Sequence, residues 1–176
     1  MRELARRIDW FQERVGRAVS WLMFGMVAVV FCDVVFRYLF SKSSVFTQEL
    51  EWHLFGIVYL LAAGYTFLYD EHVRVDIMYA KLSSRGKAWI DFVLIFVMLV
   101  PSCLLVIYTS IPFVRNSFAT GEGSPDPGGI PLRWALKSVM IIGFLLLLLQ
   151  GVSEAIKRFY WAMGWERPER RVPEVH

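Results

Sequence analysis

The chain has 176 residues, of which 56% are hydrophobic and 16% aromatic, and this exceeds the roughly 45–50% apolar content of soluble domains. The formal net charge is +3, but the basic residues flank separate apolar runs, so we expect no compact basic face for nucleic acid. The two cysteines, Cys32 and Cys103, lie inside apolar runs, which excludes a disulfide framework and a metal site built from cysteines.

The apolar residues gather in four runs. Each run is long enough to cross a bilayer, because about 20 residues with a rise of about 1.5 Å each span the hydrocarbon. The predicted spans are residues 19–40, 46–69, 88–113 and 134–156. We therefore predict an all-α membrane protein with four transmembrane helices in one domain, residues 18–157, followed by a basic cytoplasmic tail, residues 158–176.

Residues 1–17 form a separate predicted segment. Leu4, Ile8, Phe11 and Val15 fall on one face of a helix, and arginines occupy much of the remainder. This spacing predicts an amphipathic helix that lies along the membrane or docks on a partner. A solvated lead-in to the first span fits the same pattern.

The first span carries two charges, Asp33 and Arg37, four residues apart on one helical face. On insertion scales each such charge costs about 2.5–3.5 kcal/mol at mid-membrane, whereas each Leu, Ile, Phe or Val returns only about 0.3–0.6 kcal/mol. We therefore expect this span to need a partner helix.

The first two spans are joined by a short polar link, which predicts a tight antiparallel hairpin. In that hairpin Arg37 lies at the depth of the acidic entrance to the second span. We predict that Arg37 pairs with Glu49 or Glu51. Either Asp33 or His53 completes this polar cluster. The cluster either fixes the hairpin alone or takes a direct part in transport, and the sequence leaves both roles open.

The segments after the second span give fewer indications of structure and function. We expect His72, Arg74 and Asp76 to order the charged exit of the second span. In the third span Pro101 predicts a kink, because proline removes a backbone hydrogen bond and clashes with the preceding turn. Residues 115–133 contain many glycines and prolines and predict an irregular loop. Such a loop either contacts another protein or is an inert connector.

The basic residues beside the spans predict the orientation. Fourteen lie on the side that holds both termini and the link after the second span, against three on the other side. The positive-inside rule then places both termini in the cytoplasm. The cluster around Glu49 and the loop 115–133 are expected on the outer side.

The sequence lacks the residue sets of common membrane enzymes. His53 and His72 are about 28 Å apart on one predicted helix, so they cannot share a haem. No nucleophile with its base, phosphate-binding glycine loop or ATP-binding motif is present. We therefore expect neither enzyme activity nor a cofactor. The internal repeats and broken helices of complete secondary transporters are also missing, which favours an accessory or scaffold subunit.

One long segment carries a family resemblance. It reads FRYLFSKSSVFTQELEWHLFGIVYLLAAGYTFLYDEHVRVDIMYAKLS and resembles the small membrane subunit, of DctQ type, of tripartite ATP-independent periplasmic (TRAP) transporters. That family has an arginine-aromatic pair before an acidic entrance to helix two, and a histidine followed by a valine-aspartate pair at its exit. The matching positions here are Arg37 with Tyr38, Glu49, His72, and Val75 with Asp76.

The last loop and helix extend the resemblance. The segment GEGSPDPGGIPLRWALK and the apolar helix that follows look like the last loop and helix of the family. One departure concerns the entrance to helix two, where Phe46 and the Gln48-Glu49 pair stand in place of a tryptophan and two adjacent acids. Because of this departure, we assign the role of the acidic entrance to Glu49 alone.

The resemblance implies a small scaffold subunit of a secondary transporter that takes up organic acids or related solutes, usually with a sodium gradient. The implied partners are a large multi-spanning permease subunit, a periplasmic solute-binding protein and membrane lipids, with sodium bound by the large subunit rather than this chain. The residues expected to serve structure and assembly in this bacterial inner-membrane protein are Asp33, Arg37, Glu49, Glu51, His72, Arg74 and Asp76. The alternative is a self-sufficient, homo-oligomeric channel or exporter.

Overall fold

The computed structural model describes residues 1–41, 44–69 and 82–165, and every regular element in these ranges is a helix. In chain order the elements are α1 (Arg2–Phe40), α2 (Val45–Leu68), α4 (Ser84–Leu94), the π-helical turn η1 (Ile95–Leu99), α5 (Val100–Ala119) and α6 (Arg133–Ala162). The helices α4, η1 and α5 follow one another without a break and form one long helix. The prediction of an all-α protein is confirmed.

Three of these helices are long and apolar enough to cross a membrane. They are α1, the continuous helix Ser84–Ala119, and α6. Helix α2 has 24 residues and carries polar residues in its first turns, and it is not among the spans evident in the described part of the chain. The structure therefore shows a multi-pass membrane protein with three evident spans.

Residues 1–17 are the first part of a long helix, because α1 runs unbroken from Arg2 to Phe40. The buried residues in the first half of α1 are Ala5, Ile8, Asp9, Gln12, Gly16 and Val19. The face predicted from apolar residues is therefore displaced, since Leu4 and Phe11 are about half exposed. The reason is that polar Asp9 and Gln12 pack against α6, so apolar side chains alone do not mark the buried face.

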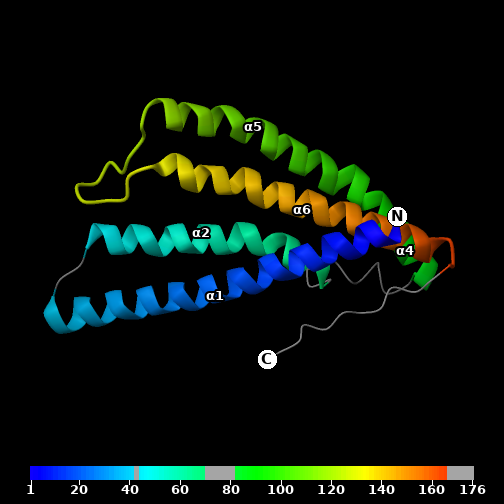
Figure 1. The fold of residues 1–176 in the computed structure, drawn as a ribbon, viewed down its shortest axis with the longest axis horizontal. Helices are drawn as coiled ribbons and strands as arrows, with labels where there is room; N and C mark the ends of the chain where they lie inside the picture. The colour runs from blue at the N-terminus through cyan, green and yellow to red at the C-terminus, as the bar shows by residue number, and fades with distance from the viewer. Residues whose placement is uncertain (42–43, 70–81, 166–176) are drawn as a thin grey trace.

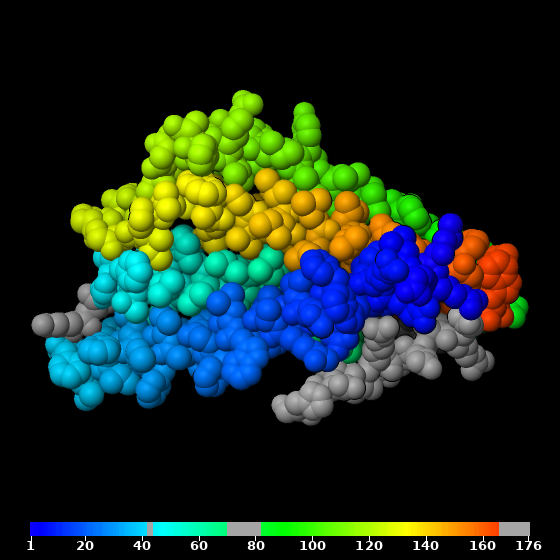
Figure 2. Space-filling model, in the orientation of Figure 1, coloured from blue at the N-terminus to red at the C-terminus, as the bar shows by residue number. Residues whose placement is uncertain are grey.

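The long helices lie side by side, mainly in one layer (Figure 1). Helix α2 lies between α1 and α6, and α5 packs on the other side of α6. The N-terminal part of α1 also contacts α6, near the end where α4 packs. The layer encloses little: even in α6, only 33% of the most apolar stretch is buried. The space-filling view shows the elongated shape that results (Figure 2).

Close packing of α2 on α6 depends on a glycine. A Cβ added at Gly143 would lie 2.7 Å from the backbone oxygen of Leu60, so the two backbones almost touch. Gly64 similarly leaves room for the side-chain amide of Gln12. Small residues allow membrane helices to approach this closely.

The distortion predicted at Pro101 takes the form of the π-helical turn η1, which ends two residues before the proline. The N–H of Val100 donates to the backbone oxygen of Ile95, five residues back. Because Pro101 lacks an N–H and its ring crowds the carbonyl four residues earlier, a wider turn relieves the clash. Leu99 of this turn packs against Gly151 of α6.

Candidate functional site: polar clusters at the two ends of the helix layer

One end of the layer is organised around Glu49, in the second turn of α2. We define the loop-end cluster as Glu49, Glu122, Ser124, Ile130, Arg133 and Lys137. Glu49 is only 5% exposed. Its carboxylate accepts hydrogen bonds from Ser124 Oγ at 2.5 Å, the N–H of Ile130 at 2.5 Å, and Arg133 Nη2 at 3.0 Å. All three donors come from the loop before α6 or from its first residue. A single carboxylate thus fixes this loop on α2.

The loop closes tightly around that carboxylate. A Cβ added at Gly129 would lie 2.6 Å from Oε2 of Glu49, so a larger residue would displace the loop. The guanidinium of Arg133 also lies over the ring of Trp52, 5.6 Å from its centroid, within the range of a cation–π interaction. Arg133 therefore connects α6 to two residues of α2.

Glu122 fixes the other side of the loop. Helix α5 ends in a Schellman motif in which Gly121 has a φ of 59° and the N–H of Glu122 donates to the backbone oxygen of Ser117. The Glu122 carboxylate then pairs with the ammonium of Lys137. Its backbone oxygen accepts the N–H of Arg133 at 3.0 Å. The hydrogen bond from Lys137 lowers the pKa of Glu122 below its ordinary value.

The structure forms different ion pairs from those expected at the hairpin of α1 and α2. Arg37 Nη2 lies 3.3 Å from Oδ2 of Asp33 on the same helix, and Glu49 binds Arg133 instead. The expected pair of Arg37 with Glu49 is thus replaced by two others, because Glu49 points to the side of α2 that packs on α6. Asp33 is buried, whereas the side chain of Arg37 is about half exposed.

The remaining predicted site residues divide into two groups. His53 is buried, and its Nδ1 lies 2.6 Å from the backbone oxygen of Glu49. Since a carbonyl only accepts, Nδ1 carries the proton. Among the described residues, His53 Nε2 and Oε1 of Glu51 are buried without a hydrogen-bond partner. The second group, residues 72, 74 and 76, lies outside the described residues.

The opposite end of the layer is organised around Asp9 of α1, which is 1% exposed. We define the terminus-end cluster as Asp9, Gln12, Asp91, Gln150, Ser153, Glu154, Lys157 and Arg158. Oδ1 of Asp9 accepts hydrogen bonds from Ser153 Oγ at 2.6 Å and from Gln150 Nε2 at 3.1 Å. Lys157 Nζ lies 3.2 Å from Oδ2. An acid near the start of the chain therefore holds α1 on the last turns of α6.

Further hydrogen bonds extend this crossing of α1 and α6. Gln12 Nε2 donates to the backbone oxygen of Leu146 at 3.0 Å, and Ser153 Oγ lies 3.2 Å from the backbone oxygen of Ala5. Gln12, Gln150 and Ser153 are completely buried. The crossing is thus polar throughout its centre, which explains why an apolar periodicity did not predict it.

The cluster also holds α4. Arg158 Nη1 lies 3.0 Å from Oδ2 of Asp91 in α4, and its Nε lies 3.6 Å from Oε2 of Glu154. Lys157 also pairs with Glu154. Two consecutive residues of α6 therefore bind different helices, since Lys157 binds α1 and Arg158 binds α4. Arg158 was expected to open a basic tail, but α6 continues to Ala162 and Arg158 is buried within it.

A sequence signal for this cluster exists only on α6. Polar residues at positions 150, 153, 154, 157 and 158 form a stripe at helical spacing on the last turns of an otherwise apolar helix. Asp9 has no such signal, because it is one of several charged residues in a segment that resembles a solvated lead-in. The stripe indicates a polar partner, but it does not identify Asp9 as that partner.

Both clusters bind elements of the chain to one another. Their carboxylates meet cations, hydroxyls or N–H groups from distant parts of the chain. Within the part of the chain that the structure describes, no group of three or more His, Cys, Asp or Glu side chains could hold a metal ion. The chemistry of both clusters is suited to holding helices and a loop in fixed positions.

Comparison with known proteins places the chain among transport components. The family model of the DctQ component of tripartite ATP-independent periplasmic transporters matches residues 26–160. A protein of Haemophilus influenzae (strain ATCC 51907 / DSM 11121 / KW20 / Rd), described as a TRAP transporter small permease protein, is 32% identical over 128 residues. That alignment covers 72% of this chain and 78% of the relative. The family match includes the whole loop-end cluster, whereas Asp9 and Gln12 precede it.

Proposed function

The chain belongs to the DctQ family of tripartite ATP-independent periplasmic transporter components, and we propose that it widens the static scaffold of a large permease subunit. The family is one of transporter components rather than enzymes. The resemblance noted in the sequence is therefore confirmed, and the chain is a small permease subunit of a TRAP transporter. Its arrangement with partners is the subject of the proposal.

The observation that carries the proposal is the open helix layer. In α1 only 11% of the most apolar stretch is buried, and in the helix Ser84–Ala119 only 17%. A layer one helix thick presents two broad apolar faces. In the proposal, the large subunit covers part of these faces and lipid covers the rest. Such a layer suits a subunit that lies along a larger membrane protein, because it adds width without enclosing a translocation path of its own.

We further propose that α2 is a fourth membrane span and that both termini are cytoplasmic. The side-by-side packing of α2 between α1 and α6 supports this, since a helix held along two spans lies at their depth (Figure 1). The distribution of basic residues supports the orientation. Helix α1 has 39 residues and is about 58 Å long, longer than the about 40–45 Å of a complete bilayer. Its arginine-rich start then projects into the cytoplasm.

The two clusters keep the scaffold in shape in this proposal. The loop-end cluster holds the periplasmic loop against α2, and the terminus-end cluster holds α1 and α4 on α6. Asp33, Arg37, Glu49 and Glu51 serve assembly of the complex, as do the charged residues at the exit of α2. The proposal places no transported solute in either cluster, because the carboxylates of Glu49, Glu122 and Asp9 bind cations of this chain.

The complete transporter is proposed to take up organic acids or related solutes with a sodium gradient. A periplasmic solute-binding protein delivers the solute, and the large subunit binds both the solute and sodium. This chain then needs no cofactor. Membership of the family supports this assignment.

The first test is affinity purification of the tagged chain from its native membrane in mild detergent, followed by mass spectrometry. We expect a larger polytopic protein in stoichiometric amount. Recovery of self-assemblies alone would contradict the proposal and favour a homo-oligomeric channel. Solute uptake in proteoliposomes tests the proposed partners and the sodium coupling. Uptake should require this chain, the large subunit, the binding protein and an inward sodium gradient. Flux through this chain alone would contradict the scaffold role.

A further inference from the structure

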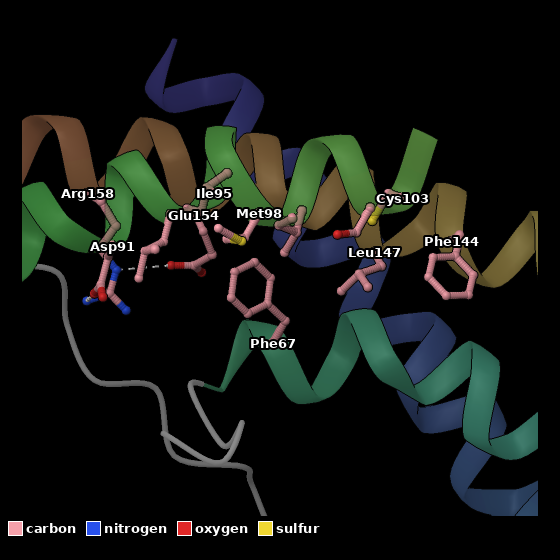
Figure 3. A pocket seen from close by; sticks show the side chains of 12 residues that line it. Phe67, Asp91, Ile95, Met98, Cys103, Phe144, Leu147, Glu154 and Arg158 are labelled. Carbon is pink, nitrogen blue, oxygen red and sulfur yellow. Dashed lines mark ion pairs between the residues drawn. The ribbon is translucent and has the colours of Figure 1, made fainter. Parts of the chain in front are cut away.

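A groove lies between α2 and the helix formed by α4, η1 and α5, with α6 as its floor (Figure 3). Its lining includes Phe67 of α2, Met98, Ser102 and Cys103 of η1 and α5, and Phe144 and Leu147 of α6. We propose that this groove binds one acyl chain of a membrane phospholipid. The proposal concerns this chain within the membrane and does not depend on the large subunit.

The groove follows from how the helices pack. Helices α2 and α5 both pack on α6, which separates them. The wide π-helical turn lies along the groove and contributes Ile95, Met98 and Leu99 to its wall. Gly151 of α6 allows Leu99 to approach closely, since an added Cβ would lie 2.7 Å from Cδ2 of Leu99. The sides of the groove are therefore helix α2 on one side and α4, the π-helical turn and α5 on the other, all packed on α6.

The dimensions fit a hydrocarbon chain. The groove has a volume of about 480 Å³. Its lining on α6 extends from Phe144 to Arg158, about 21 Å of helix. This elongated, mostly apolar shape along one helix fits an extended acyl chain, whose neighbours lie about 4 Å from its carbon atoms.

The polarity of the lining indicates in which direction the acyl chain lies in the groove. Most of the groove is apolar, but one end is lined by Asp91, Glu154 and Arg158, where Arg158 bridges the two acids (Figure 3). Charged groups are costly in hydrocarbon and lie near the headgroup level when they can. The charged end therefore marks the level of the lipid headgroup, and the acyl chain extends from there toward Cys103 and Phe144.

The test is lipid retention by the detergent-purified complex, measured by native mass spectrometry after repeated detergent washes. We expect the wild type to retain one phospholipid per chain. The double variant Met98→Trp with Ser102→Trp fills the groove and should retain at least five-fold less. The matched control is Leu105→Trp. Leu105 is as exposed as Met98, at 63% against 59%, but does not line the groove. This control should retain lipid as the wild type does.

Three results would overturn the inference: no retained phospholipid in the wild type, equal retention in the double variant, or equal loss in Leu105→Trp. A photo-crosslinking residue at Met98 gives an independent readout, which stands even if the tryptophan variants do not fold. A lipid adduct is expected, and an adduct with another polypeptide would overturn the proposal. Co-purification of the large subunit, followed in the same samples, shows whether the scaffold role fails separately.

Discussion

The two polar clusters both act on α6, but they hold different kinds of structure. At the loop end, Glu49 of α2 binds the Ser124 hydroxyl and the Ile130 N–H of an irregular loop, and the guanidinium of Arg133, the first residue of α6. At the terminus end, Asp9 of α1 binds side chains that project from α6 itself. The first cluster therefore orders a loop, and the second fixes a helix crossing. Damage to the first should stay local, whereas damage to the second should affect the whole layer.

The largest effect is expected from Asp9→Ala. This change removes the buried carboxylate on which Lys157, Gln150 and Ser153 converge. Removing one partner of a buried ion pair costs about 3–5 kcal/mol, and the expected loss lies at the lower end of that range, because Lys157 is 25% exposed and keeps its pair with Glu154. We expect a lower temperature of thermal unfolding, measured by circular dichroism in detergent. Glu3→Ala is the control, because its pairs with Arg6 and Arg7 are exposed and worth at most about 1 kcal/mol.

A rescue sharpens this prediction. Replacement of both Asp9 and Lys157 by leucine removes both partners of this pair together and leaves Glu154 its pair with Arg158, so it should recover part of the stability lost in Asp9→Ala. If Asp9→Ala melts at the same temperature as Glu3→Ala, the terminus-end cluster does not hold the layer together. This result would contradict the expected difference between the two clusters.

The next effect is expected from Gly143→Ala, at the packing of α2 on α6 between the two clusters. The added Cβ would meet the backbone oxygen of Leu60 at 2.7 Å, and overpacking of this kind costs about 1–3 kcal/mol. Since the change separates the two helices, both thermal stability and protection of the loop should fall. Gly25→Ala is the control, because nothing lies within 4 Å of its added Cβ. Equal behaviour of the two variants would show that the helices do not pack closely here.

Glu49→Ala should have a more local effect. It removes the acceptor for Ser124, Ile130 and Arg133, so residues 120–132 should be cut several-fold faster by a non-specific protease. The unfolding temperature should change less than in Asp9→Ala. Glu49→Gln keeps an acceptor oxygen and should be intermediate. A loop that stays equally resistant in Glu49→Ala would show that other contacts fix it.

The same variant tests the assembly role of Glu49. We expect Glu49→Ala to lower the amount of large subunit that co-purifies more than it lowers the apparent affinity for solute in uptake. The physical reason is that the carboxylate binds the loop and not a solute. Normal assembly with altered sodium coupling would assign Glu49 a direct part in transport instead.

The smallest effect is a pH dependence of the loop. The hydrogen bond from Lys137 lowers the pKa of Glu122 from an ordinary value of 4.5. The contribution of Glu122 is therefore complete above pH 4.5 and is lost as the pH falls through the lowered pKa. Hydrogen exchange of residues 120–132, corrected for its intrinsic rate, should rise only in that acidic range. In Lys137→Met the rise should begin at higher pH. An unchanged profile would show that this pair does not protect the loop.

The two clusters also differ in how far the sequence could predict them. The acid at the entrance to α2 is conspicuous, because a carboxylate next to an apolar run requires a partner. The sequence therefore indicates Glu49, but not Arg133, which lies 84 residues later. Arg37 was the nearer candidate along the chain. It instead pairs with Asp33, since the direction of the Glu49 side chain depends on which helix packs against that face of α2.

At the terminus end the prediction failed for a different reason. Apolar periodicity in residues 1–17 selects Leu4 and Phe11, which are about half exposed. The buried face instead contains Asp9 and Gln12, whose partners lie about 140 residues away on α6. A periodicity of apolar side chains cannot locate an interface built from hydrogen bonds.

The sequence by itself determined the all-α fold, the apolar spans, the distorted third span and the family, because length, hydropathy, proline and local motifs act within one segment. The tertiary structure alone decided which carboxylate meets which donor, that α1 continues over α6, and that a groove separates α2 from α5. These features depend on the order and rotation of the helices in the layer. Close contacts such as Gly143 with Leu60 fix that rotation, and only the packed chain brings such distant residues together.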